Sequence, residues 1–317
     1  MKYKDKKKVL VIGSLNVDMV TNVDHTPVAG ETILGDKLDL IPGGKGANQA
    51  CAAGRLGADV TMFGALGDDQ YAMISKKSLI DSGINVSYLI KKKHTGTGVA
   101  LITVDKEGDN SIVVIPGANA KLSMEDIDRN IVLIEQSDIV VFQLEIPVET
   151  VLYAARKAKE LNKLVILDPA PAPPEFPMEL YRYVDVIKPN ETELGILAKT
   201  ENVLENLYEA TELLKDYGVK HVIVTLGNKG VYVNSFSQGI EQIPSYEVQV
   251  VDTTAAGDSF TASLALMLAE GKELMEAVRY ANLVAAIVVT RKGAQSSIPS
   301  VDEVREYEGK LNVVRNI

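Results

Sequence analysis

Cysteine and histidine are scarce in this 317-residue chain, and each scarcity excludes a class of protein. The single cysteine, Cys51, cannot form a disulfide within the chain, so we expect a reducing compartment and a buried thiol without a catalytic role. The three histidines, His25, His94 and His221, lie far apart in the sequence without the spacing of metal ligands. Zinc catalysis and a Ser–His–Asp hydrolase are therefore both poorly supported.

The chain also has fewer basic than acidic residues, and it has no long apolar run. The formal net charge of −10 argues against a surface for nucleic acid or anionic membrane. The apolar stretch Ala281–Thr290 has about half of the ~20 residues that a membrane span needs. After a basic start at residues 1–8, the run Val9–Gly13 is too short for the core of a signal peptide. We therefore expect a cytoplasmic protein with no nucleic-acid and no membrane partner.

Two common nucleotide-binding motifs are missing. The stretch from Gly44 to Gln49 reads Gly-x-Gly-x-x-Gln, which lacks the third glycine of the dinucleotide fingerprint and does not directly follow a predicted strand. The pattern Gly-x-x-x-x-Gly-Lys-[Ser/Thr] occurs nowhere in the chain. The sequence therefore argues against a dinucleotide-binding turn and contains no Walker A loop.

What the chain does have is an alternation of short β-branched runs with helical patterns. In Asn202–Tyr217, for example, Leu207 and Leu214 fall on one helical face. Such alternation predicts an α/β fold, with a mostly parallel sheet and helices on both faces. Although the length would allow two domains, α/β units are often large, and we expect a single domain over residues 1–317. The predicted strands are Val9–Gly13, Val60–Leu66, Ile139–Phe142, Leu164–Leu167, Val184–Ile187 and Val222–Thr225.

Two segments, at about residues 18–42 and 95–117, interrupt this alternation. Gly98–Val104 and Ser111–Ile115 are strand-like, and the polar run Asp105–Asn110 between them has the composition of a hairpin turn. We expect the two segments to form a small antiparallel sheet that projects from the main one. Such a sheet is a candidate lid, or a dimer surface if one of its faces is apolar.

The densest chemical signal is the stretch Asp252–Asp258, which leads into a helix predicted from Phe260 to about Ala269. Its small residues let backbone N–H groups approach an anion closely. A carboxylate at Asp258 could accept a proton from a hydroxyl group beside that anion. The alternative is an ordinary helix start, where the helix dipole favours an acidic residue.

Three other clusters suit a polar ligand such as a sugar. Gly43–Ala50 combines three glycines with the amide of Asn48, although it could be only a glycine-rich turn before a helix. Asn16 and Asp18 are alternate residues of an extended segment, so both side chains can face one ligand, or they could serve a turn. Glu145 ends the run Val140–Glu145, at the carboxyl end of a predicted strand, where open α/β sheets bind their ligands.

Two further loops follow predicted strands and suit a nucleotide. Asn190 and Glu193 could lie near a hydrated magnesium ion and phosphate oxygens, or they could form a capping box at a helix start. The loop Thr225–Gly230 has the small residues that a nucleotide-facing loop needs. Its alternative role is a glycine turn that joins two strands.

Taken together, these segments resemble the ribokinase family of carbohydrate kinases, also called the PfkB family, from about Val9 to Pro299. The two family signatures appear as Gly43–Asn48 and Asp252–Phe260. Further similarity lies in Gly13–Asp18, Pro116–Ala120, Gln143–Glu145 and Thr290–Gln295, of which the last is characteristic of the ribokinase members.

The resemblance implies a three-layer α/β/α fold with a small β lid that pairs two subunits. It implies transfer of the γ-phosphoryl group of ATP to the 5-hydroxyl of D-ribose, with Mg²⁺ as cofactor and K⁺ as activator. Asp258 matches the catalytic base, and the anion hole matches Ala255, Ala256 and Gly257. Sugar-binding positions match Asn16, Asp18, Gly44, Lys45, Asn48, Glu145 and Asp258.

The resemblance also assigns the nucleotide and the ions. Nucleotide-side positions match Asn190, Thr225, Gly227, Gly230, Gly257 and Asn282. Glu193 lies near magnesium, through water. The monovalent-cation site matches Asp252, Thr254, Val288, Arg291, Gly293 and Ser297, with Val288 and Arg291 contributing backbone carbonyl groups.

Two other functions remain open from the sequence. A kinase for 2-deoxyribose or for a nucleoside would reuse the phosphate site and differ at the sugar. A non-catalytic sugar-binding protein would not need a carboxylate at Asp258, so the presence of that residue argues against it.

Overall fold

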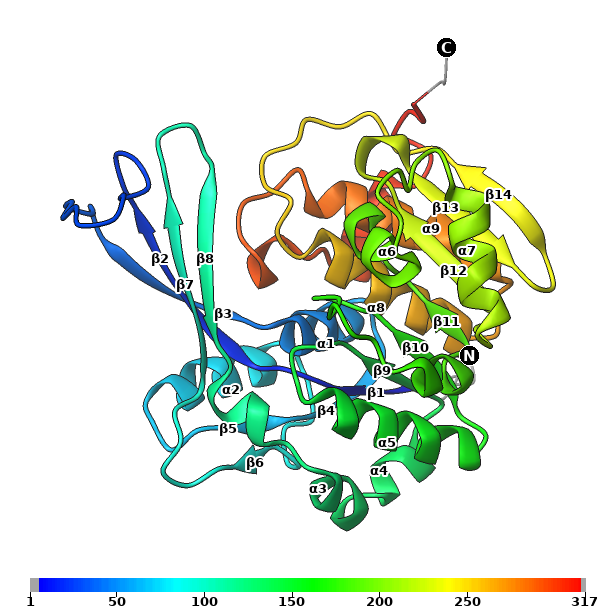
Figure 1. The fold of residues 1–317 in the computed structure, drawn as a ribbon, viewed down its shortest axis with the longest axis horizontal. Helices are drawn as coiled ribbons and strands as arrows, with labels where there is room; N and C mark the ends of the chain where they lie inside the picture. Colours follow the sequence, from blue (N-terminus) through cyan, green and yellow to red (C-terminus); the bar gives the residue numbers. More distant parts are fainter. Residues whose placement is uncertain (1–5, 315–317) are drawn as a thin grey trace.

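A computed structural model describes residues 6–314 and shows a central eight-stranded sheet (Figure 1). Residues 1–5, which form most of the basic start, lie outside the described part. The strand order is β14-β13-β12-β11-β10-β9-β1-β4, parallel from β4 to β12 and antiparallel at β13 and β14, which confirms the predicted mostly parallel sheet. The strands are β1 (Lys8–Ile12), β4 (Asp59–Phe63), β9 (Ile139–Phe142), β10 (Leu164–Leu167), β11 (Val186–Ile187), β12 (His221–Thr225), β13 (Val231–Ser235) and β14 (Gly239–Ile243).

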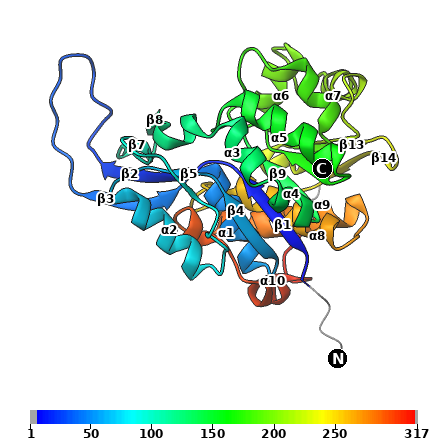
Figure 2. The ribbon, with the colours of Figure 1, turned by 90° about the horizontal axis from the view of Figure 1, so that it is seen from below.

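Helices cover both faces of this sheet, because its strands bury alternate residues in two separate cores (Figure 2). In β1, Val9 and Val11 pack into one core, and Leu10 and Ile12 into the other. This confirms the three-layer α/β/α fold. The first core receives α1 (Lys45–Arg55), α2 (Tyr71–Asp81), α8 (Ala256–Ala269), α9 (Leu274–Val288) and α10 (Val301–Tyr307); the second receives α3 (Met124–Arg129), α4 (Val132–Gln136), α5 (Val148–Glu160), α6 (Glu191–Ala198) and α7 (Leu207–Asp216).

A second sheet of four strands projects from the body of the molecule as an arm (Figure 1). Its order is β3-β2-β7-β8, with β2 (Asn16–Asn22), β3 (Leu38–Gly43), β7 (Gly98–Val104) and β8 (Asn110–Ile115). The pairs β2–β3 and β7–β8 are antiparallel as expected, and Asp105–Asn110 turns between the latter. The expectation of a wholly antiparallel sheet was wrong, since β2 and β7 pair in parallel. Both strands leave the body and run towards the tip of the arm, so they point the same way where they meet.

Three predicted boundaries shift by three residues or more. The strand predicted at Val60–Leu66 breaks at Gly64, after which β5 (Ala65–Leu66) leaves the main sheet to pair with β6 (Ile90–Lys91). The helix predicted from Phe260 begins earlier, at Ala256, and the helix predicted from Asn202 begins later, at Leu207. Short 3-10 turns complete the described chain at Gly117–Lys121, Met178–Tyr183, Gly227–Lys229 and Gln295–Ser297.

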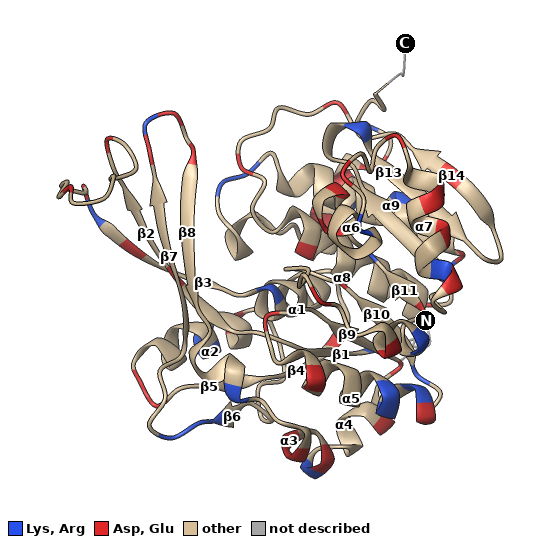
Figure 3. Cartoon of the chain, viewed as in Figure 1, with Lys and Arg blue, Asp and Glu red and all other residues tan. Residues whose placement is uncertain are grey.

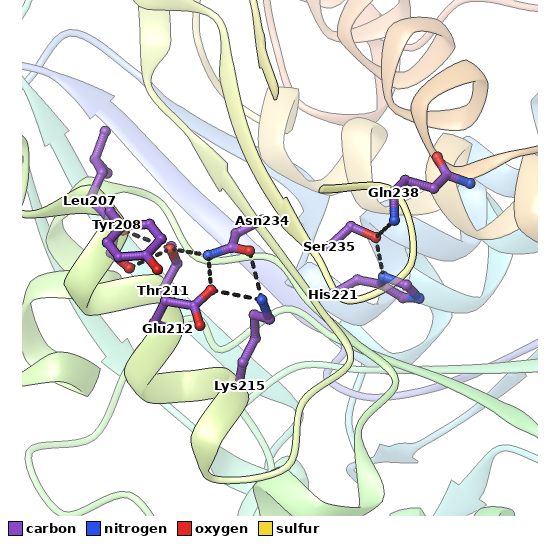
Figure 4. Close-up of polar contacts among 9 residues, drawn as sticks. All are labelled: Leu207, Tyr208, Thr211, Glu212, Lys215, His221, Asn234, Ser235 and Gln238. Atoms are coloured by element: carbon purple, nitrogen blue, oxygen red, sulfur yellow. Dashed lines mark hydrogen bonds and ion pairs between the residues drawn. The ribbon is translucent and has the colours of Figure 1, made fainter. Parts of the chain in front are cut away.

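A buried polar network fastens α7 to the antiparallel end of the sheet (Figure 4). Asn234 of β13 donates hydrogen bonds to Oγ1 of Thr211 at 3.0 Å and to Oε1 of Glu212 at 2.8 Å, and it accepts one from Nζ of Lys215 at 2.9 Å. Nearby, Nδ1 of His221 lies 2.9 Å from Oγ of Ser235. These contacts satisfy the buried amide within the protein, so the network is structural.

Within residues 6–314, the structure contains no helix with the length and apolar composition needed to cross a membrane, and no group of three or more His, Cys, Asp or Glu residues that could hold a metal ion. Cys51 is fully buried in α1, where burial raises the pKa of its thiol. This confirms the expectation of a buried cysteine.

Candidate active site

Polar side chains gather at the carboxyl ends of the parallel strands. Ser14 follows β1, Glu145 follows β9, Asp168 follows β10 and Lys188 follows β11, while Thr225 ends β12. Carboxyl ends of parallel strands lie on one edge of a sheet, and ligands of open α/β sheets bind there. The N-terminus of α8 meets the same edge, where Oγ1 of Thr261 donates to Oδ2 of Asp168 at 3.2 Å.

The start of α8 has the backbone of an anion-binding turn. Ala255, the residue before the helix, is in the left-handed region at φ 62°, a conformation that is unfavourable for a residue with a side chain and is common at functional turns. The amide of Ala256 donates to the carbonyl oxygen of Thr253 at 3.2 Å. The amides of Gly257 and Asp258 lie in the first helical turn, where the helix offers them no acceptor. The amide of Ala255 also donates no hydrogen bond within the described residues. The amides of Ala255, Gly257 and Asp258 are therefore available to an anion, whereas the amide of Ala256, which belongs to the predicted anion hole, is already bonded.

The Asp258 carboxylate is buried at this helix start, with only 6% of the residue exposed. Nδ2 of Asn48 donates to its Oδ2 at 2.9 Å, and Nε2 of Gln49 donates to its Oδ1 at 3.3 Å. Burial raises the pKa of Asp258, the ammonium group of Lys45 opposes this, and the carboxylate of Asp168 raises the pKa further. A carboxylate with a raised pKa is a better proton acceptor than a solvated one.

Asp18 lies on β2 close to two other carboxylates. Burial, together with the charges of Glu145 and Asp258, raises its pKa to about 7. The pKa of Asp18 therefore responds to a carboxylate, that of Asp258, which lies 240 positions further along the sequence. Asn16, two residues before Asp18 on the same strand, is buried, and its Oδ1 accepts a hydrogen bond from Nδ2 of Asn119 at 2.8 Å.

The glycines before α1 are required by the close approach of β2. A Cβ atom on Gly43 would lie 2.3 Å from Oδ2 of Asp18, and one on Gly44 would lie 2.7 Å from the backbone nitrogen of Asn16. Gly44 also has φ of +90°, which favours glycine. The backbone of the turn therefore lies in close contact with the strand that carries Asn16 and Asp18. A side chain at Gly43 or Gly44 would prevent this contact.

Lys45 and Glu145 meet at the start of α1. Oε2 of Glu145 accepts hydrogen bonds from Oγ of Ser14 at 2.6 Å and from the backbone nitrogen of Lys45 at 3.1 Å. Burial alone would lower the pKa of the Lys45 side chain, but the carboxylates of Asp258, Asp168, Glu145 and Glu193 outweigh it and hold the pKa above its usual value. The Lys45 ammonium group therefore stays charged among these acidic groups.

Asn190 and Glu193, which are predicted to lie near a nucleotide, form the alternative capping box. The backbone nitrogen of Glu193 donates to Oδ1 of Asn190 at 2.8 Å, and the backbone nitrogen of Asn190 donates to Oε2 of Glu193 at 2.9 Å. Burial, and then the charge of Asp168, raise the pKa of Glu193. Thr225 pairs with Asn190 through an isolated bridge, which brings the two loops together.

The loop after Thr225 is also the predicted glycine turn between two strands. It joins β12 to β13, with Gly227 at φ +55° and Gly230 at φ +86°. Asn282 lies on α9, is buried, and donates from Nδ2 to the carbonyl oxygen of Pro244 at 2.9 Å. The structural alternatives for Asn190 and for the glycine loop are therefore confirmed, while their nucleotide-binding roles stay predictions.

Asp252 joins the loop before α8 to the loop after α9. Its Oδ1 accepts hydrogen bonds from the backbone nitrogen and Oγ1 of Thr254 at 2.9 and 2.6 Å, and its Oδ2 accepts one from the backbone nitrogen of Gly293 at 2.8 Å. Burial raises the pKa of Asp252, but these hydrogen bonds outweigh it and hold the pKa below its usual value. Nearby, Arg291 pairs with Glu303 at 2.9 Å, and Oγ of Ser297 donates to the carbonyl oxygen of Ala294 at 2.7 Å, so neither side chain is directed to Asp252.

Sequence reasoning missed a buried network behind Asp258. Nε2 of Gln49 donates to Oδ2 of Asp168 at 3.0 Å as well as to Asp258, and Oγ1 of Thr261 donates to the same Oδ2 at 3.2 Å. Nζ of Lys188 lies 3.2 Å from Oδ1 of Asp168. The available signal was the one used for Glu145, since Asp168 and Lys188 are also charged residues that directly follow predicted strands.

Comparison with known proteins agrees with this fold and site. Residues 6–301 match the model of the pfkB family carbohydrate kinases. A ribokinase of Haemophilus influenzae is 40% identical, covering 95% of this chain and 98% of its own, and a deoxyribokinase of Salmonella typhi is 39% identical, covering 94% and 98%. The solved structure of Arabidopsis thaliana ribokinase complexed with ribose and ATP has a TM-score of 0.88 and 33% identity, covering 95% and 98%. The chain therefore belongs to the pfkB family of carbohydrate kinases, which confirms the resemblance seen in its sequence.

Proposed function

We propose that this protein transfers the γ-phosphoryl group of ATP to the 5-hydroxyl of D-ribose, giving D-ribose 5-phosphate and ADP. The observation that carries the proposal is the buried carboxylate of Asp258 beside the available amides of the α8 N-terminus. Similarity over nearly the whole chain to ribokinases, one of them complexed with ribose and ATP, supports it.

The chemistry follows from these groups. Asp258 accepts the proton of the sugar 5-hydroxyl group while the oxygen of that hydroxyl group bonds to the γ-phosphorus of ATP. The bond between the γ-phosphorus and the oxygen that bridges it to the β-phosphorus then breaks, and ADP leaves. The anion hole proposed at Ala255, Ala256 and Gly257, together with the adjacent amide of Asp258, donates hydrogen bonds to the charge that develops on the transferred group. The sugar is held by Asn16, Asp18, Gly44, Lys45, Asn48 and Glu145, which offer donors and acceptors for several hydroxyl groups.

The nucleotide is assigned to the loops at Asn190 and Thr225–Gly230, to Gly257 and to Asn282. Mg²⁺, when bound with ATP, neutralises phosphate charge. Glu193 suits a contact to Mg²⁺ through water, because its Oε2 already accepts the capping hydrogen bond from the backbone nitrogen of Asn190. Glu193 would therefore orient water around the ion.

Potassium is expected to activate the enzyme, and sodium to do so more weakly. The site would comprise oxygen atoms of Asp252, Thr254, Val288, Arg291, Gly293 and Ser297. This oxygen-rich set fits a hard cation, and Asp252 already ties its two loops together next to the start of α8. An ion there could shape the anion-binding turn without touching ATP. Turnover should fall in potassium-free buffer containing a bulky organic cation, and undiminished turnover would contradict the proposal.

The arm is proposed as a lid that excludes water from the sugar and as the contact between two subunits. Its strands β7 and β8 carry no charged residue, whereas the turn between them does (Figure 3). Ile112, Val113, Val114 and Ile115 of β8 are each about half exposed, which is unusual for a solvent-facing edge strand. A molar mass of one subunit in light scattering would exclude the dimer.

A cytoplasmic location is proposed from the need for ATP and the single buried cysteine.

Substrate preference tests the proposed function directly. D-ribose should be preferred over 2-deoxyribose and over nucleosides, because the sugar-binding set suits a free, fully hydroxylated pentose. Removing one hydroxyl group leaves its buried partner unpaired, at about 1–3 kcal/mol, or roughly 5- to 150-fold in kcat/KM. A coupled ADP assay run side by side on the three substrates measures it.

The second candidate is 2-deoxyribose, since a deoxyribokinase is nearly as similar as the ribokinases. Equal or higher kcat/KM for 2-deoxyribose or adenosine would move the assignment to that substrate and leave the phosphoryl-transfer mechanism in place. Absence of ADP formation with every sugar would contradict the kinase itself.

A further inference from the structure

Lys188 is a buried cation that the sugar and nucleotide assignments above leave without a role. The residue is 3% exposed, between β11 and α6, and its Nζ lies 3.2 Å from Oδ1 of Asp168, which is 2% exposed. Within residues 6–314, Nζ of Lys188 donates no hydrogen bond, and Oδ1 of Asp168 accepts none. The contact is therefore an ion pair without hydrogen-bond geometry, which leaves the three N–H groups of the lysine available to a ligand.

The ammonium group is directed at the anion-binding turn. A Cβ atom built on Gly257 would lie 3.4 Å from Nζ of Lys188, so the ammonium group is next to the amides that start α8. A cation and a helix N-terminus both attract negative charge, and here they converge on one place. A glycine at position 257 keeps that place open, since a side chain would occupy the space in front of Nζ.

Asp168 is well placed to hold this cation. Its Oδ2 accepts hydrogen bonds from Gln49 of α1 and Thr261 of α8, which fix the carboxylate on two helices. Burying a lone ammonium group is unfavourable, and a fixed carboxylate compensates its charge when no anion is bound. Because Gln49 also donates to Asp258, the pair is anchored to the same side chain as the proposed base.

We propose that Lys188 is a phosphate-binding residue, whose ammonium group contacts the terminal phosphate of the nucleotide at the start of α8, and that Asp168 positions it. The inference rests on the proposed phosphoryl transfer and adds to it a cation from the β11–α6 loop. Lysine binds phosphate as a point charge, and a charge-assisted hydrogen bond is about twice as strong as a neutral one. The alternative is that the pair only joins β10 to β11.

Nucleotide affinity separates the two roles. Removing Lys188 alone leaves Asp168 buried without its partner and can unfold the protein. The decisive variant therefore neutralises both residues, as Lys188→Met with Asp168→Asn, beside Lys188→Met alone. Lys220→Met is the matched control, since Lys220 pairs with Asp185 at 2.8 Å at the opposite, amino-terminal edge of the strands.

Binding of a non-hydrolysable ATP analogue with Mg²⁺, and of D-ribose, is measured by calorimetry, with thermal unfolding beside it. We expect the double variant to unfold near the wild-type temperature, to bind the analogue about 10- to 150-fold more weakly, and to bind ribose as the wild type does. The Lys220→Met control should bind both ligands normally. Wild-type affinity for the analogue in the folded double variant would overturn the inference. Because this readout needs no sugar turnover, a wild-type protein that binds the analogue but phosphorylates no ribose would count against the proposed function alone.

Discussion

Asp258→Asn is expected to lower turnover by about 10²–10⁴-fold, the usual span for the loss of a general base, and to leave ribose binding largely intact. Asparagine keeps the size of the side chain and an oxygen that can accept from Asn48, but it cannot take a proton from the sugar hydroxyl. The fall should appear in kcat measured with saturating ribose and ATP, while calorimetry shows an unchanged ribose affinity.

Stability provides the check that the loss is chemical. Because burial raises the pKa of Asp258, its ionised form is unfavourable in the folded protein, and Asp258→Asn should unfold at the wild-type temperature or above it near pH 8. Asp302→Asn, an exposed carboxylate on α10, is the control for the substitution itself. A folded Asp258→Asn protein with near wild-type turnover would remove Asp258 from the base role.

Asp18→Asn is expected to stabilise the folded protein near pH 8 and to lower its affinity for ribose. The pKa of Asp18 is raised from 3.8 to about 7, so the folded protein holds a proton there that the unfolded chain has lost. Stability associated with that proton is complete below pH 3.8 and is lost as the pH rises to about 7. At about 1.4 kcal/mol for each pKa unit, the substitution should raise the free energy of unfolding at pH 8 by up to about 4 kcal/mol.

The effect on ribose should have the opposite sign. We expect the ionised Asp18 carboxylate to accept hydrogen bonds from ribose hydroxyl groups, and losing a hydrogen bond to a charged group weakens binding by about 10- to 150-fold. In the wild-type protein, ribose affinity should rise with pH up to about 7 and then level off, whereas in Asp18→Asn it should not follow this curve. Calorimetry and urea unfolding from pH 5 to 9 measure both. A destabilised variant, or one that binds ribose as tightly as the wild type at pH 8, would contradict this account of Asp18.

Much of the fold could be predicted because its parallel strands are buried on both faces. Ile139–Phe142 and Leu164–Leu167 are uniformly apolar runs, and both occur in the structure with the predicted bounds. Boundaries failed where one backbone conformation overrides the apolar pattern. Ala255 in the left-handed region lets α8 begin at Ala256, which no apolar period indicates.

The sequence by itself determined the layered α/β architecture, the projecting strands and the family, because local periodicity and contiguous glycine motifs carry them. Only the tertiary structure decided that β2 and β7 run parallel, since pairing between distant strands has no local signature. Only the tertiary structure brought Asp168 and Lys188 together behind Gly257, and set the pKa of Asp18 near 7. The ion pair and the raised pKa both depend on burial and on the distances between charges from separate strands. Those quantities do not exist until the chain is folded.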